Sequence, residues 1–142
     1  MTSERRREAF RRIVTSGMTP GILAYVGGQP AAWSAVAPRE AHPALERSPV
    51  LARIDDAPGW SIVCLFVGRA FRRRGLVLPL IRAAVAHARS GGARIVEAYP
   101  SAATRRLDAP SAYLGTVTMY RRAGFRVVRR PSARRRIVRL SC

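Results

Sequence analysis

The stretch WSIVCLFVGRAFRRRGLVLPLIRAAVAHARS, residues 60–90, determines the fold that we predict for this chain. It opens with an apolar run, Trp60 to Val67, that has the length and the β-branched and aromatic content of a buried strand. A basic turn that ends at Gly75 follows this run. Beyond the turn, apolar residues recur with the i, i+3, i+4 spacing of an amphipathic helix: Val77, Leu80, Ile81, Ala84, Val85 and Ala88.

The turn between the predicted strand and helix has the features of an anion-binding site. The first N–H groups of a helix lack partners within it, and the helix dipole places positive charge at the same end. Gly75 permits a backbone conformation, or a close approach, that a side chain would obstruct. The sequence contains neither a GxxxxGK(S/T) phosphate loop nor a GxGxxG dinucleotide fingerprint. We therefore predict a different kind of phosphate site, built from the amides of this turn.

The turn resembles the acetyl-CoA motif of the GNAT superfamily of N-acetyltransferases, which reads Gln or Arg, two residues, Gly, one residue, then Gly or Ala. Here the motif is RRRGLV from Arg72 to Val77, with valine in place of the second small residue. Two further resemblances follow in the family's order. They are the strand end VEAYP, residues 96–100, and YRRAGF, residues 120–125, which is similar to the family's Y-x-x-x-G-F. Together they extend over roughly residues 20–140.

This resemblance implies a single α/β domain over residues 1–142, with a mixed, mostly antiparallel central sheet flanked by helices. The remaining patterns predict further elements in a compatible order: strands over 22–26, 31–37, 94–99, 125–130 and 136–140, and helices over 4–16 and 117–123, the last capped by Thr116. The chain has no room for the family's usual first strand and helix. We therefore expect the strand over 22–26 at an edge of the sheet.

The resemblance also implies a cofactor site along the central strand and the turn. Its residues would be Leu65, Phe66, Val67, Arg72, Arg73, Arg74, Gly75, Leu76, Val77 and Thr116. In the family the parallel strands beside the helix splay apart, so the pantetheine arm of acetyl-CoA would pair with exposed main chain around Leu65 and Val67. The backbone N–H near Leu65 would face the thioester oxygen. No metal is expected.

The catalytic residues that we predict are Tyr120 and Glu97. Tyr120 falls on the family's tyrosine, the usual general acid for the leaving thiolate, although a core aromatic at this position is the alternative. Glu97 is a carboxylate in a predicted core strand, where burial is costly unless the group has a partner or a function. We interpret it as the general base, with an ion pair to one of the many arginines as an equal alternative.

Other residues are weaker candidates for the chemistry. Ser61 occupies the position where some members carry a glutamate, and it cannot act as a base. Asp55, Asp56 and His42 come next after Glu97; they lie in a proline-rich connection over residues 38–59 that is either a solvated loop or a functional one. Cys64 is not expected to be a nucleophile, because an apolar strand raises the pKa of a thiol.

The composition limits the partners and the compartment. The net charge is +18, and all 26 basic residues are arginine, as either a polyanionic partner or a GC-rich coding sequence would produce. Two cysteines do not indicate a disulfide framework or a zinc site. No apolar run approaches the ~18 residues of a membrane span, so we expect a cytoplasmic protein without a membrane partner.

These observations predict an acetyl-CoA-dependent N-acetyltransferase that moves an acetyl group from CoA to a primary amine by direct transfer in a ternary complex. The acceptor is a small molecule or a protein amine. The alternative is a non-catalytic CoA-binding regulator, or a basic nucleic-acid-binding module on the same scaffold. Nucleic acid is the less favoured partner, because aromatic residues do not interleave the basic ones, and a homodimer is left open.

Overall fold

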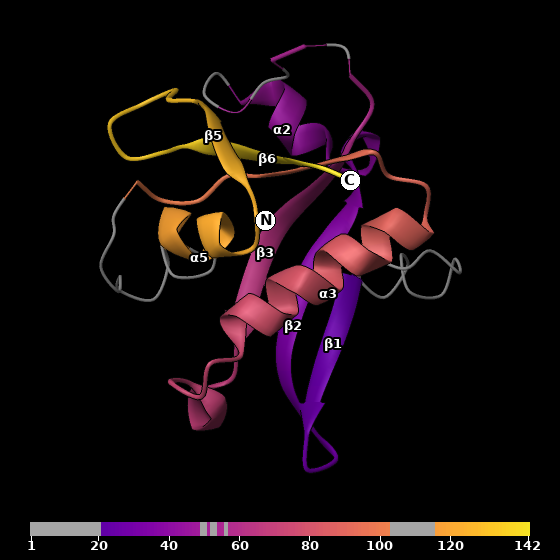
Figure 1. Ribbon diagram of the computed structural model, residues 1–142, viewed down its shortest axis with the longest axis vertical. Coiled ribbons are helices and arrows are strands. Elements are labelled where there is room, and N and C mark those ends of the chain that lie inside the picture. Colours follow the sequence, from indigo (N-terminus) through magenta and orange to yellow (C-terminus); the bar gives the residue numbers. More distant parts are fainter. Residues whose placement is uncertain (1–20, 49–50, 52–53, 56, 103–115) are drawn as a thin grey trace.

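The computed structural model describes residues 21–48, 51, 54–55, 57–102 and 116–142. Its strands form one six-stranded sheet in the order β1-β2-β3-β4-β6-β5, in which only β3 and β4 are parallel (Figure 1). The strands are β1 Gly21–Val26, β2 Gln29–Pro38, β3 Trp60–Val67, β4 Ile95–Ala98, β5 Arg126–Arg129 and β6 Ile137–Ser141. The sequence prediction of a mixed, mostly antiparallel sheet is thus confirmed. The helix expected over residues 4–16, and Asp56, lie outside the described residues.

The described residues form three α-helices beside the sheet: α2 Pro43–Arg47, α3 Val77–Ser90 and α5 Val117–Arg122. Glycine ends α3, since Gly92 has φ 95° and the Ala93 N–H donates a hydrogen bond to the Ala88 carbonyl at 2.9 Å. Thr116 caps α5, because its hydroxyl accepts a hydrogen bond from the Met119 N–H at 3.4 Å. The C-terminus of α3 and the N-terminus of α5 are therefore fixed by local chemistry that is visible in the sequence.

The hairpin between β1 and β2 turns more tightly than the sequence predicts. Gly27 and Gly28 have φ 57° and 80°, the two left-handed residues of a type I′ turn, whose twist matches that of the flanking strands. Because this turn needs only two residues, β2 begins at Gln29 rather than Ala31. Within the described sheet β1 pairs only with β2, which agrees with its expected edge position.

The two faces of the sheet are covered differently. On one face α3 packs against β1, β2 and β3, and α5 lies beside it (Figure 1). This main core includes Ala98 and Val138, whereas their neighbours Tyr99 and Ile137 point to the other face. There they form a second, smaller cluster with Leu45 of α2, against which further side chains of the 38–59 connection pack.

Candidate functional site

The pairing of β3 with β4 ends early, and we call the open side of β3 beyond this point the cleft. The two strands pair over only three positions, the last of which is Ile62 with Ala98. A bulge lies at the same level on β3: Ala35 of β2 pairs with Cys64 and Val36 pairs with Ile62, so Val63 is an extra residue. Bulges of this kind are common next to active sites, where they re-aim the backbone.

The chain beyond β4 follows a different partner. The Tyr99 carbonyl accepts a hydrogen bond from Arg135 Nη1 at 2.9 Å, and the Pro100 carbonyl accepts one from the Arg136 N–H at 3.0 Å. The Ala102 N–H then donates to the Arg134 carbonyl at 2.9 Å. Among the described residues, no strand therefore pairs with β3 beyond Ile62 on this side. An extended ligand fits such an open strand by adding hydrogen bonds to its main chain.

The turn after β3 presents backbone amides to open space. Arg73 and Gly75 are both left-handed, with φ 62° and 72°, and α3 follows without a side-chain cap at Leu76. The first helical bond runs from the Leu80 N–H to the Leu76 carbonyl, and no described residue accepts a hydrogen bond from the amides of residues 73–78. A Cβ placed on Gly75 would meet nothing within 4 Å. These features fit an anion such as pyrophosphate.

The arginines of the turn border both the strand and the helix. Arg72 Nε donates to the Val67 carbonyl at 3.1 Å, so this side chain folds back onto the end of β3. The guanidinium of Arg74 lies 5.5 Å from the centre of the Phe71 ring. A pantetheine that used the Val67 carbonyl would have to share it with Arg72 or displace that side chain.

Tyr120 lies in the main core, on the same face as α3. Its side chain is 1% exposed and meets the Phe125 ring edge-on at 5.1 Å. Burial raises the pKa of the Tyr120 hydroxyl far above its usual value, and the nearby Cys64 thiol raises it further. Burial likewise raises the pKa of Cys64. Tyr120 belongs to the same core cluster as Ile62 and Leu65, the β3 residues on either side of Val63 and Cys64.

Glu97 lies on the opposite face of the sheet from Tyr120. It is 6% exposed, and Arg139 Nη2 stands 3.5 Å from its carboxylate. The same guanidinium forms a two-pronged pair with Asp55, at 2.9 and 3.2 Å. The ion pair that sequence reasoning held as an alternative for Glu97 is thus present. The link to Asp55 could not have been read from the sequence, because Asp55 and Arg139 are 84 residues apart.

A buried polar group that sequence reasoning missed lies two residues beyond Glu97. The Tyr99 hydroxyl is 2.7 Å from the Ser61 hydroxyl and accepts a hydrogen bond from Arg39 Nη1, also at 2.7 Å. Burial is the main reason that the pKa of Tyr99 is raised. The sequence held no signal for Arg39, which was one arginine among 26.

His42 lies close to this group. Burial, followed by the charge of Arg39, lowers the pKa of its imidazole, and the buried Nε2 has no hydrogen-bond partner among the described residues. His42 also precedes α2, for which its side chain forms no cap. It therefore belongs to the polar cluster on the Glu97 face and is not a plain surface histidine.

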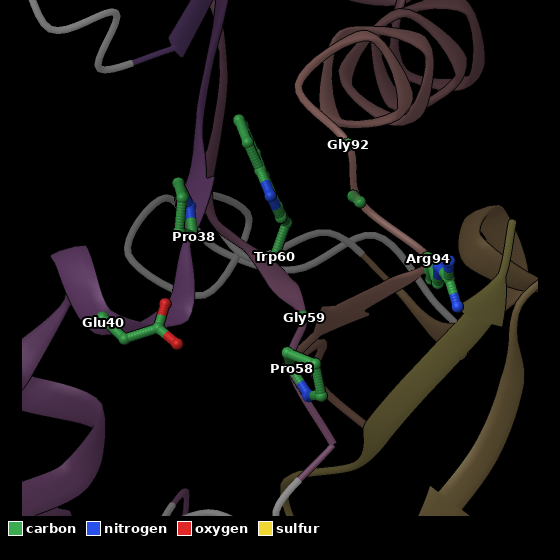
Figure 2. A pocket seen from close by; sticks show the side chains of 8 residues that line it. Pro38, Glu40, Pro58, Gly59, Trp60, Gly92 and Arg94 are labelled. Carbon is green, nitrogen blue, oxygen red and sulfur yellow. The ribbon is translucent and has the colours of Figure 1, made fainter.

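A cavity of about 300 Å³ lies away from this cleft (Figure 2). Trp60 stands between Pro38 and Gly92, with Glu40 and Arg94 toward opposite sides of the opening. The cavity lies at the first residue of β3, whereas the phosphate turn follows the last residue, roughly 25 Å away along an eight-residue strand. The cavity is therefore distant from the phosphate turn, although Trp60 is adjacent to Ser61, the β3 partner of Glu97.

The part of the chain that the structure describes contains no cluster of three potential metal ligands. In the same residues, every helix is too short or too polar to cross a bilayer.

Comparisons with known proteins agree with this geometry. Residues 3–125 match the family model described as Acetyltransferase (GNAT) family, and no curated protein sequence matches. Similar solved structures include a ribosomal-protein-alanine N-acetyltransferase from Brucella melitensis, with 15% identity, 100% of this chain and 80% of that one covered, and a TM-score of 0.63.

Two further structures have comparable similarity. An aminoglycoside 6′-N-acetyltransferase from Acinetobacter haemolyticus has 19% identity, 92% and 78% coverage of the two chains, and a TM-score of 0.57. A chain of the NatC complex bound to Gag peptide and CoA has 11% identity, 95% and 79% coverage, and a TM-score of 0.60. At such identities these likenesses concern the fold.

Proposed function

Since the chain belongs to the GNAT family of acetyltransferases, we propose that it transfers an acetyl group from acetyl-CoA to a primary amine by direct attack within a ternary complex. The observation that carries this proposal is the open main chain of β3, which leads directly into a turn of unpartnered amides. Two free cysteines are consistent with a reducing compartment such as the cytoplasm.

The cofactor in this proposal lies along β3 and across the turn. Pantetheine pairs with the main chain around Leu65, beyond the last β3–β4 pair. The pyrophosphate is held by the amides from Arg73 to Val77, where the positive end of α3 adds to their attraction. The left-handed Arg73 supports this assignment, because strained backbone persists mainly where function requires it.

The reaction forms a C–N bond and breaks the C–S bond of the thioester. The amine must lose a proton, and the departing thiolate must gain one. Tyr120 is our general acid, because it lies on the α3 face in one core cluster with Ile62 and Leu65, the part of β3 where the pairing with β4 ends. Its raised pKa keeps it protonated at neutral pH but makes full proton transfer to a thiolate unfavourable at the outset. We infer that a hydrogen bond from Tyr120 stabilises the developing thiolate before the proton moves.

Glu97 is our general base, acting directly or through water from the other face of the sheet. It stands at the second of the three β3–β4 pairs, one residue before the strands separate. Its contact with Arg139 holds the carboxylate in place. In this arrangement Tyr120 serves the sulfur of the thioester and Glu97 serves the attacking amine.

The acceptor class stays open between small amines and protein amines. The similar structures include one enzyme named for a ribosomal-protein alanine and one named for an aminoglycoside. A cationic acceptor is best recruited by carboxylates, and Glu97 and Asp55 are the described ones on the proposed amine side, where both pair with Arg139.

Thiol release from acetyl-CoA, measured across a panel of small amines and N-terminal peptides, tests the proposed activity. Saturating acetyl-CoA, at about 100 times its dissociation constant, should also raise the free energy of unfolding by about 2.7 kcal/mol. A protein that neither binds acetyl-CoA nor releases thiol with any amine would contradict the proposal.

Gly75→Ala, with Gly92→Ala as its matched control, tests the phosphate turn. Both glycines have positive φ and open space around a new Cβ, so both substitutions strain the backbone alike. Alanine is preferable to valine, because a β-branched residue tolerates φ 72° poorly. Only Gly75→Ala should weaken acetyl-CoA binding, as measured by calorimetry. Equal affinities in the two variants would refute the turn as the phosphate site.

A further inference from the structure

Three segments of the chain meet at the Tyr99 side chain, beside the point where β3 and β4 separate. Ser61 belongs to β3, Tyr99 follows β4, and Arg39 follows β2. All three are almost completely buried, at 1%, 2% and 3% exposure, so water does not compete for the two 2.7 Å contacts of the Tyr99 hydroxyl. A charged donor such as guanidinium makes the stronger kind of hydrogen bond.

Arg39 also ties this point to the 38–59 connection. Its second nitrogen, Nη2, donates to the Leu51 carbonyl at 2.8 Å. The guanidinium lies 6.0 Å from the centre of the Tyr99 ring, so the two side chains are in contact beyond the single hydrogen bond. One buried guanidinium therefore fixes Tyr99 relative to a segment on the face of the sheet opposite α3.

The open cleft needs such a restraint. Backbone groups of β3 beyond Ile62 would gain partners if the ladder continued from Ala98 to Tyr99. That continuation requires the Tyr99 backbone to move toward β3, which distorts the bonds from Arg39 to its hydroxyl and from Arg135 to its carbonyl. Both guanidinium groups thus oppose closure of the cleft, one through the side chain of Tyr99 and one through its main chain.

We propose that Arg39 is a positioning residue of the acetyl-transfer site: by holding the Tyr99 hydroxyl, it keeps the chain after β4 away from β3 and so keeps the pantetheine cleft open. This inference rests on the acetyl-CoA function proposed above. In this proposal Arg39 acts through Tyr99, so it is a positioning residue and not a catalytic one.

Calorimetric titration of full-length variants tests the proposal with two probes. Acetyl-CoA needs the cleft and the turn, whereas adenosine 3′,5′-bisphosphate lacks the pantetheine arm and does not enter the cleft. Arg39→Met and Tyr99→Phe should each weaken acetyl-CoA binding by about tenfold or more, the loss of one buried charge-assisted hydrogen bond. Binding of the bisphosphate should be unchanged. A purely structural role would affect both probes alike or neither.

Two controls make the result specific. Arg47→Met removes an exposed arginine from the neighbouring α2 and should leave acetyl-CoA affinity as in the wild type. In the double variant Arg39→Met/Tyr99→Phe the two losses of affinity should not multiply, because the bond between Arg39 and Tyr99 is lost in either single variant. Tyr99→Phe also removes the contact with Ser61, and Arg39→Met also removes the bond to the Leu51 carbonyl, so a small further loss is expected. Tyr99→Phe keeps the buried ring, so it provides the test if Arg39→Met does not fold.

The outcomes separate this inference from the proposed function. Wild-type affinity for acetyl-CoA in folded Tyr99→Phe, or multiplied losses in the double variant, would overturn the role of Arg39 while leaving the acetyltransferase intact. A wild-type protein that binds no acetyl-CoA would overturn both.

Discussion

At the scale of single residues, the two groups that we assign to the chemistry occupy different environments. Tyr120 is surrounded by apolar side chains of the main core, and burial raises its pKa. Glu97 is equally inaccessible but has a guanidinium 3.5 Å away. Each environment has a structural explanation as well as a catalytic one. Substitutions that preserve the shape of the side chain distinguish between these two explanations.

Tyr120→Phe keeps the ring in the core and removes only the proton donor. In the proposed mechanism turnover should fall by about 10²–10⁴-fold, the usual contribution of general acid catalysis, while acetyl-CoA affinity stays constant. The rate of thiol release measures turnover, and calorimetry with acetyl-CoA measures the affinity. Full activity in Tyr120→Phe would mean that this residue is a core aromatic and nothing more.

Glu97→Gln keeps the side-chain shape and removes the base. Its loss of turnover should shrink as pH rises, because more of the amine is then already neutral. The same substitution takes away one partner of Arg139, which retains Asp55. A pH–rate profile for this variant and for wild type decides between the roles. A small loss at neutral pH, together with lower stability, would identify Glu97 as structural and direct the search for a base to Asp55, His42 or water.

At the scale of elements, the sequence predicts well whatever is encoded locally. The run from Trp60 to Val67 forms β3 with the predicted bounds, and the apolar spacing after Gly75 forms α3. The strand over 94–99 is shorter in the structure, because after Ala98 the chain leaves β3 and follows residues 134–136. Long-range hydrogen bonds cause that change, and no local pattern encodes them.

The same limit applies to the candidate site. Its phosphate turn is a contiguous motif and could be predicted from Arg72 to Val77. The contacts of Arg39 with Tyr99 and of Arg139 with Asp55 join residues 60 and 84 positions apart. In a chain with 26 arginines, nothing in the sequence distinguishes these two from solvated ones. Burial selects them, and burial is a property of the folded chain.

The 38–59 connection should make the protein sensitive to mild acid through His42. The pKa of His42 is lowered in the folded state. Below the unfolded value of about 6.5, the imidazole therefore binds a proton more readily in the unfolded chain than in the folded one. The stabilisation is therefore present above that pH and is lost as pH falls. His42→Gln should lose less stability than wild type between about pH 7.5 and 5, as measured by urea unfolding. If the free energies of unfolding of wild type and His42→Gln fell in parallel over this pH interval, His42 would make no such contribution.

At the scale of the whole molecule, the net charge of +18 dominates. Eight acidic residues cannot neutralise 26 arginines, so the surface repels a second copy of the chain and attracts polyanions. Salt therefore changes the two kinds of association in opposite directions. Binding to nucleic acid weakens as salt rises, because the release of counterions from the nucleic acid then contributes less to the binding free energy. Association between like-charged copies strengthens, because salt screens their repulsion.

We expect self-association through the β1 end of the sheet, and we expect it to increase with salt. In the described sheet β1 has a partner on one side only, and its Leu23 and Tyr25 side chains are 53% and 61% exposed. An edge strand without proline or charge is a template for pairing with another copy. Light scattering at micromolar protein should therefore report a larger mass at 0.15 M salt, where the Debye length is about 8 Å, than at 0.01 M, where it is about 30 Å.

Leu23→Lys should restore the monomer, whereas Val128→Lys, which charges an exposed side chain of β5 at the other end of the sheet, should not. A monomer at both salt concentrations, in which the β1 amides that do not bond to β2 exchange at once, would show that neither a second copy nor another segment protects this edge.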